Sequence, residues 1–134
     1  MLGRKDYTKD EIATGKKAVA DQLAAFKKLR KAAGATADAA ETVYFNNMVL
    51  VLDRYYVHRI RPVTGKDHNP LNEVELLVDA LINNGGVLRG NNVIKLAPEQ
   101  SVLGLKEGDP IQLNAADFQR LAAAFFEELE RKFG

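Results

Sequence analysis

The stretch YFNNMVLVLDRYYVHR, residues 44–59, decides the fold because a long apolar run occupies its middle. At 100° per residue its apolar side chains cover one broad face of a helix, and positions 47, 51, 54, 58 and 61 line up on roughly the opposite face. The run MVLVL alone also fits a buried strand, but length and capping residues favour the central helix of a bundle. The predicted core face consists of Tyr44, Phe45, Met48, Val49, Leu52, Tyr55 and Tyr56.

The ends of this central helix are marked by local signals. Thr36 or Asp38 is the expected N-cap, since both side chains can accept a hydrogen bond from a free backbone amide. Pro62 is expected to end the helix, because the residue before a proline avoids the helical region. The helix is therefore predicted to continue to Arg61.

Three further helices are predicted from caps and periodicity. Thr8 and Glu11 have the spacing of a capping box, and Gly34 supplies a stop, so residues 8–34 form a helix with a narrow apolar stripe, much alanine and a weak point at Gly15. Asn69 followed by proline starts a helix that stops at residues 84–86. Asn114 caps a last helix with an aromatic-rich face.

The segment 85–113 is too long for a bare loop in a compact domain. Val87–Arg89 and Val93–Leu96 flank a Gly/Asn turn and predict a β-hairpin, and Lys106–Pro110 predicts a second turn. Residues 1–8 are expected to be loose. The predicted fold class is mainly α: a four-helix bundle-like single domain over residues 1–134, with a small β-hairpin element between the third and fourth helices.

Residues 93–113, VIKLAPEQSVLGLKEGDPIQL, resemble a segment of swapped-hairpin DNA-binding regulators. In that family a short strand and a proline precede L-G-L-K-x-G-D and another strand. The resemblance covers about twenty of the 134 residues; the spacing from Pro98 to Leu103 is shorter than is usual there, and the basic N-terminal strand of the family is missing. The resemblance implies local β structure and, as a functional expectation, DNA binding.

Composition limits the classes of protein that fit. The chain is 46% hydrophobic and 28% charged, which is ordinary for a folded domain, and it has no cysteine for disulfides, thiolate ligands or a thiol nucleophile. No apolar run reaches the length of a signal peptide or a membrane span, so we expect a cytoplasmic protein without membrane contact. Residues 1–66 carry 13 Lys+Arg against 7 Asp+Glu, whereas residues 67–134 carry 6 against 11. This asymmetry indicates either a basic surface for an anionic partner or attraction between the two halves, within one fold or across a homodimer. The near-neutral total charge of +1 favours attraction between the halves.

A candidate ligand site lies at the end of the central helix. Arg54, His58 and Arg61 share one helical face at spacings of four and three, so two guanidinium groups flank an imidazole. Such a stripe, with Tyr55 beside it, fits a phosphate or carboxylate. The alternative is that Arg54 and Arg61 pair with the acidic second half of the chain.

Other chemistry has little support in the sequence. His58 and His68 do not have a metal-ligand spacing, no catalytic motif is present, and we assign no catalytic residue, metal or cofactor. The basic residues of the first helix lack interleaved aromatics and a DNA-binding motif, which disfavours nucleic acid as a partner.

We expect a non-enzymatic interaction or structural protein that forms a homodimer. One alternative is a protein that uses the Arg54 stripe to bind a small anion, or to act as an unfamiliar enzyme. A further alternative is a DNA-binding protein. Aromatic residues available to such an interface are Phe125, Phe126 and Phe133.

Overall fold

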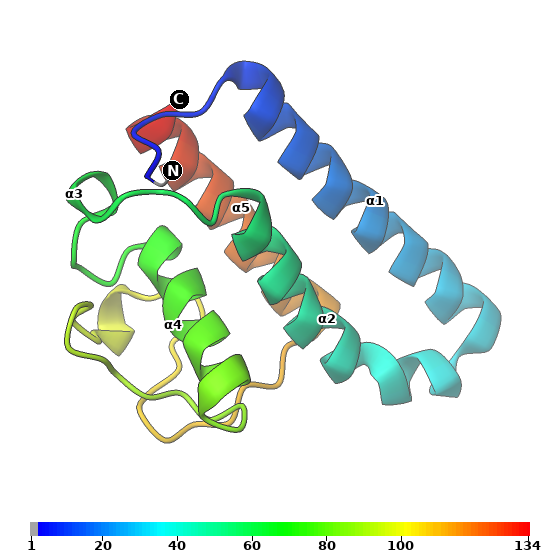
Figure 1. Ribbon diagram of the computed structural model, residues 1–134. Helices are drawn as coiled ribbons and strands as arrows, with labels where there is room; N and C mark the ends of the chain where they lie inside the picture. Colours follow the sequence, from blue (N-terminus) through cyan, green and yellow to red (C-terminus); the bar gives the residue numbers. More distant parts are fainter. Residues whose placement is uncertain (1–2) are drawn as a thin grey trace.

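The computed structural model describes residues 3–134, which form five α-helices and one short 3-10 helix, with no β-strand in this part of the chain (Figure 1). The mainly helical class predicted from the sequence is therefore confirmed. The helices are α1 (Lys9–Ala33), α2 (Ala35–Tyr55), α3 (Arg61–Thr64), α4 (Pro70–Asn83) and α5 (Ala115–Phe133), and the 3-10 helix η1 spans Pro98–Gln100.

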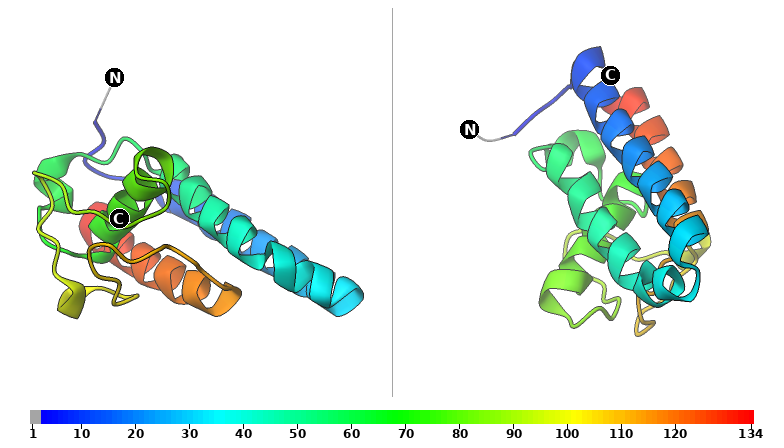
Figure 2. Two further views of the ribbon diagram at one scale, coloured as in Figure 1. Left: turned by 90° about the horizontal axis from the view of Figure 1, so that it is seen from below. Right: turned by 90° about the vertical axis from the view of Figure 1, so that its right-hand side faces the viewer.

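The four long helices pack around one hydrophobic core. The α2 helix contacts α1, α4 and α5, and α5 in turn contacts α1, α2 and α4, so α2 and α5 together hold the centre (Figure 2). Phe45 and Leu52 of α2, Leu77 of α4, and Phe118 and Phe125 of α5 are fully buried. Burial of these large side chains is the main source of stability, at roughly 2 kcal/mol for each apolar side chain removed from water.

Three of the four long helices start where their caps predict. Thr8 accepts the Glu11 amide at 3.1 Å while the Glu11 carboxylate accepts the Thr8 amide at 3.0 Å, which completes the capping box of α1. Asn69 accepts the Asn72 amide at 3.0 Å at the start of α4, and Asn114 caps α5 in a reciprocal pair with Asp117. Each cap satisfies amides that the helix itself leaves free.

The start of α2 differs from the prediction. Gly34 has φ of 47°, a conformation that favours glycine, and this single residue both ends α1 and precedes α2. The helix begins at Ala35 with no side-chain cap, so Thr36 and Asp38 are inside the helix rather than before it. The tight turn makes α1 and α2 an antiparallel helical pair (Figure 1).

The α2 helix ends at Tyr55, so the predicted continuation to Arg61 is wrong. Tyr56 leaves the helix because its side chain is buried against α1, where its hydroxyl donates to the carbonyl of Glu11 at 2.8 Å. Burial raises the pKa of Tyr56 to about 12, so the hydroxyl stays a neutral donor. Residues 56–58 form a turn in which the Arg59 amide donates to Tyr56 O at 3.3 Å, and the carbonyl of His58 accepts the Arg4 amide at 2.6 Å. Tertiary contacts therefore end this helix before Pro62 does.

The predicted β-hairpin between residues 87 and 96 is also wrong. Residues near Val87 pair with a more distant segment: the Leu88 amide donates to Asp109 O at 2.9 Å, and Val87 and Pro110 form an isolated bridge. Asn91 explains why the second expected strand is absent, because its side chain accepts the amides of residues 93 and 94 at 2.8 Å each. These two amides point back at Asn91, so they do not serve a strand partner.

Side chains from the helical part hold segment 85–113 in place instead of a sheet. Asn46 of α2 donates to Ile111 O at 2.8 Å and accepts the Leu113 amide at 3.2 Å. The buried carboxylate of Glu73 accepts the amides of Val102 and Leu103 at 2.7 and 3.0 Å. Buried backbone amides need partners, and here polar side chains supply them.

The turn expected at Lys106–Pro110 is present. The Asp109 amide donates to Lys106 O at 3.0 Å, and the Asp109 carboxylate accepts the Lys106 amide at 2.8 Å. No strand flanks this turn among the described residues, so the local β structure implied by the resemblance to swapped-hairpin regulators is not found. Only the turn of that motif is shared.

Contacts hold residues 3–8, part of the segment expected to be loose. The Ile60 amide donates to Arg4 O at 3.1 Å, and Arg4 pairs with Glu11 at 2.7 Å. Tyr7 is buried, and its hydroxyl donates to Tyr56 O at 3.1 Å. The remaining two residues of the expected loose segment, 1 and 2, lie outside the described residues.

No helix within residues 3–134 has the length and apolarity needed to cross a membrane.

Candidate functional site

The predicted stripe of Arg54, His58 and Arg61 does not share a helical face, because α2 ends at Tyr55. Arg54 lies in the last turn of α2, His58 in the turn that follows α2, and Arg61 at the first position of α3. His58 is exposed. The structure therefore divides the three predicted ligand residues among three elements.

The side chain of Arg61 makes several contacts within the chain. Its guanidinium donates to Asn72 Oδ1 at 2.8 Å and to Gly65 O at 3.1 Å, and it pairs with the carboxylate of Glu75. The pairing with the acidic second half, which was the alternative interpretation of the sequence, holds for Arg61. This side chain ties the connector that follows α2 to α4.

Arg54 and Tyr55 border a surface hollow together with Leu50 and Val51. Tyr55 is 44% exposed, so its predicted place on the core face is wrong. Arg54 is exposed and, within residues 3–134, makes no hydrogen bond or ion pair through its side chain. Two of the four predicted ligand residues, Arg54 and Tyr55, thus lie side by side on one apolar surface.

Arg59, which the sequence analysis passed over, is the buried cation of this region. Its side chain is only 3% exposed, pairs with Asp53 at 2.9 Å and donates to Tyr56 O at 2.9 Å. The guanidinium also lies over the ring of Phe125, 5.3 Å from its centroid. Its Nε has no hydrogen-bond partner among the described residues. These contacts join the connector to α2 and α5, and they assign Arg59 a structural role.

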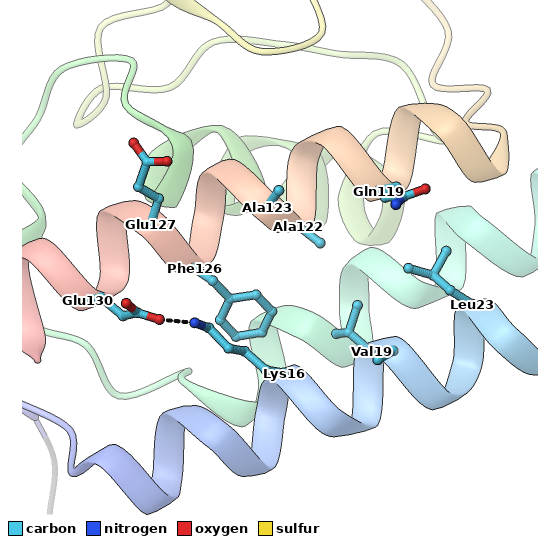
Figure 3. A pocket seen from close by; sticks show the side chains of 10 residues that line it. Lys16, Val19, Leu23, Gln119, Ala122, Ala123, Phe126, Glu127 and Glu130 are labelled. Carbon is cyan, nitrogen blue, oxygen red and sulfur yellow. Dashed lines mark ion pairs between the residues drawn. The ribbon is translucent and has the colours of Figure 1, made fainter.

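A groove of about 490 Å³ lies between α1 and α5 (Figure 3). Figure 3 shows the ring of Phe126 pointing from α5 toward α1, where it lies beside Lys16. Small side chains line much of the rest, including Ala20 on α1 and Ala123 on α5, both exposed. Alanine leaves space beside a helix, so another helix can approach closely at this surface.

The groove continues along most of both helices. Leu23 and Gln119 also border a second hollow, lined in part by Lys27 and Ala115. Toward the other end, Lys16 and Glu130 border a third hollow that reaches Gly134. Residue numbers rise along α1 as they fall along α5, so the two helices are antiparallel. We call this whole surface the α1–α5 groove.

The two sides of the α1–α5 groove carry opposite charge. The α1 side has Lys16 and Lys27, and the α5 side has Glu127 and Glu130. Lys16 and Glu130 form an ion pair across the groove, drawn as a dashed line in Figure 3. Lys27 and Glu127 form no ion pair within residues 3–134. The asymmetry of charge between the two halves of the chain is thus present on one surface.

Phe125, Phe126 and Phe133 do not form the exposed aromatic surface expected from the sequence. Their exposed fractions are 0%, 6% and 0%, because all three rings face the core. Phe126 alone reaches the outside, as part of the floor of the α1–α5 groove. Apolar contact with a partner must therefore come from the groove walls rather than from aromatic side chains standing on the surface.

The basic side chains of α1 are partly neutralised. Lys17 pairs with Asp21 at 2.7 Å, and Arg30 pairs with Asp38 at 2.9 Å and with Glu41. Together with the Lys16–Glu130 pair, these contacts neutralise three of the basic side chains of α1 that could otherwise contact DNA phosphates.

Within residues 3–134, no group of three or more histidine, aspartate or glutamate side chains is arranged to hold a metal ion. His68 is buried, and its Nδ1 accepts the Ala97 amide at 2.8 Å, so it serves to hold segment 85–113.

Comparisons of the chain with protein-family models, with curated proteins and with solved structures each gave no match. The functional proposal therefore depends on the geometry of this chain alone.

Proposed function

We propose that this protein is a non-enzymatic interaction protein that forms a homodimer through the α1–α5 groove. The observation that carries the proposal is a long, alanine-lined groove with cations on one side and carboxylates on the other. A surface with both charges is complementary to a second copy of itself, whereas a single sign of charge would favour a different partner. In this proposal the bundle-like arrangement of the four long helices is a scaffold that presents the groove.

The size of the surface supports this partner. The α5 helix has 19 residues, and at 1.5 Å per residue the groove is about 28 Å long. Two adjacent helices of about 10 Å diameter make it about 20 Å wide, so each copy would bury about 560 Å² and the pair about 1,100 Å². This area lies just above the roughly 1,000 Å² that a biological interface should clear, and below the roughly 1,200–2,000 Å² of stable interfaces of standard size.

The test measures the mass of the protein in its native state at tens of micromolar, by native mass spectrometry and by sedimentation. We expect a dimer that dissociates when Ala20→Arg places a long cation in the groove. The matched control is Ala25→Arg, at an exposed position of the same helix that does not line the groove. A strict monomer for the unmodified protein, or equal dissociation by both variants, would reject the proposal.

A second candidate function rests on the hollow at the end of α2. Arg54 offers a guanidinium with no partner among the described residues, next to the apolar Leu50 and Val51. A carboxylate with an apolar tail fits such a surface, because the charge and the tail are both matched. We expect octanoate to raise the melting temperature and inorganic phosphate to have a smaller effect. If Arg54→Ala leaves the octanoate shift unchanged, the hollow is not a binding site.

A further inference from the structure

The charges along the α1–α5 groove also specify how two copies would face each other. We propose that the two-fold axis of the homodimer runs parallel to the groove, so that α1 of each copy lies on α5 of the partner. This inference rests on the proposed function, since it describes the same interface in more detail. It predicts which side chains meet across the interface. It also predicts which charge reversals make a variant dimerise with an oppositely charged variant rather than with itself.

Two orientations bring the grooves of two copies face to face. A two-fold axis along the groove keeps each residue at its own level and exchanges the two sides, so α1 meets the partner's α5. A two-fold axis across the groove reverses the levels, so α1 meets the partner's α1 and α5 meets the partner's α5. Only the first orientation places the carboxylates of α5 against cations of the partner, at the level of Lys16 and Glu130.

The levels of the residues follow from contacts across the groove. Lys16 lies level with Glu130, because the two form an ion pair, and Leu23 lies level with Gln119, because both border the same two hollows. With the axis along the groove, Lys16 therefore meets the partner's Glu130, and Glu127 follows one turn away. The ion pair within each chain becomes a group of two cations and four carboxylates shared by both copies.

The orientation with the axis across the groove has the opposite effect. The groove extends from Lys9 to Arg30 on α1, so its midpoint lies near residue 20, and reversal about this point places the basic groove side of α1 against itself, with Lys9 opposite the partner's Arg30. Glu127 and Glu130 would then lie against the opposite end of the partner's α5, which Gln119 and Ala115 line, and so away from any cation of the groove. Like charges facing each other destabilise an interface, so this orientation is disfavoured.

Figure 3 places these groups where a partner can reach them. Lys16 and Glu130 lie at one end of the groove beside Phe126, and Glu127 points away from α1 on the outer edge of α5. Lys16 and Glu130 are each 47% exposed, so a partner helix can contact them without unfolding either one. The alanine-lined middle of the groove carries no charge, so the orientation depends on the cations and carboxylates on either side of it.

The experiment uses reversed charges on each side of the groove. One variant carries Lys16→Glu, and a second carries Glu127→Lys with Glu130→Lys. In the homodimer of either variant, like charges face each other at both symmetry-related copies of the contact. We therefore expect the dissociation constant of each homodimer to rise about tenfold. In an equimolar mixture both contacts become complementary again, so a heterodimer should form more tightly than either homodimer. Lys28→Glu, at an exposed position outside the groove, is the matched control and should leave the dimer unchanged.

Native mass spectrometry distinguishes the homodimers from the heterodimer by mass, and thermal unfolding shows that each variant is folded. A homodimer of Lys16→Glu that is as tight as the unmodified protein, or tighter, overturns the proposed orientation, since the crossed arrangement places the carboxylate introduced at position 16 against the basic groove side of the partner's α1. A mixture without preferred heterodimer overturns it as well. If the unmodified protein is monomeric, the proposed homodimer itself fails, which is a different result from a dimer that ignores these charges.

Discussion

Gly15→Ala is expected to destabilise the protein, against the usual behaviour of such a change in a helix. Gly15 lies within α1, where alanine normally stabilises by about 1 kcal/mol relative to glycine. A Cβ built at this position would overlap the Tyr56 hydroxyl and would lie 2.7 Å from its Cζ, far inside contact distance. The glycine is therefore needed because the tyrosine ring packs directly on the helix backbone.

The Tyr56 ring has little freedom to move away. It is 1% exposed, packs edge-on against Tyr7 with 5.0 Å between ring centroids, and is also held by its hydrogen bond to Glu11 O. Overpacking a rigid core costs about 1–3 kcal/mol, which exceeds the gain in helix propensity. After the gain of about 1 kcal/mol in helix propensity, we expect a net loss of up to about 2 kcal/mol, or a fall in melting temperature of roughly 5 °C for a domain of this size.

Thermal and urea unfolding of Gly15→Ala, followed by circular dichroism, measure this effect. Ala25→Gly in the same helix is the control, since its exposed position reports helix propensity alone and should cost about 1 kcal/mol. A rise in melting temperature for Gly15→Ala would show that Tyr56 is not packed on α1 as described. The early end of α2 would then need another explanation.

Two further predictions concern polar contacts. Glu73→Ala leaves the amides of Val102 and Leu103 without acceptors, so the free energy of unfolding should fall by about 2–4 kcal/mol and hydrogen exchange in residues 95–105 should become faster. Glu73→Gln should lower the free energy of unfolding less. Equal exchange rates in these two variants and in the unmodified protein would contradict the role of Glu73. Arg4 and the Thr8 amide lower the pKa of Glu11 from 4.5 to about 2, so the stabilising effect of this carboxylate is complete above its unfolded pKa and is lost as the pH falls through about 2. NMR titration of Glu11 should show the low pKa in the unmodified protein and a value closer to the ordinary range in Arg4→Ala, and an unchanged pKa would remove Arg4 as the main cause.

Helix starts were predictable because their chemistry is local. Thr8, Asn69 and Asn114 each bond an amide three residues further along, and this spacing is visible in the sequence. The end of α2 was not predictable in the same way. Tyr56 leaves the helix through a bond to a carbonyl 45 residues away, which no local pattern records.

The error over segment 85–113 has the same origin. Alternating apolar residues predicted a hairpin, but the partners of this backbone are side chains far away in sequence, such as Asn46, which is 65 residues from Ile111. A nearer signal was present in Asn91, whose side chain can bond the amides two and three residues ahead and so compete with strand pairing. The hairpin prediction gave too little weight to this competition.

The candidate site shows the same limit. The sequence placed Arg54, His58 and Arg61 on one face only because the helix was extended too far, and the contact of Arg61 with Glu75 joins residues 14 apart through a turn. The α1–α5 groove could not be predicted, since nothing local shows that these two helices are neighbours. The signal that hinted at it was the narrow apolar stripe of the first helix, which leaves an alanine face without a packing partner.

The most direct test of the homodimer is chemical cross-linking through the α1–α5 groove. The chain has no cysteine, so Ala20→Cys and Ala123→Cys each introduce a single thiol into the groove, and Ala25→Cys introduces one outside it. With a short bis-maleimide, we expect the mixture of Ala20→Cys and Ala123→Cys to give a covalent dimer in high yield, well above any mixture that contains Ala25→Cys. Equal yields from all mixtures, or no covalent dimer from the groove pair, would contradict the proposal that a second copy occupies this groove.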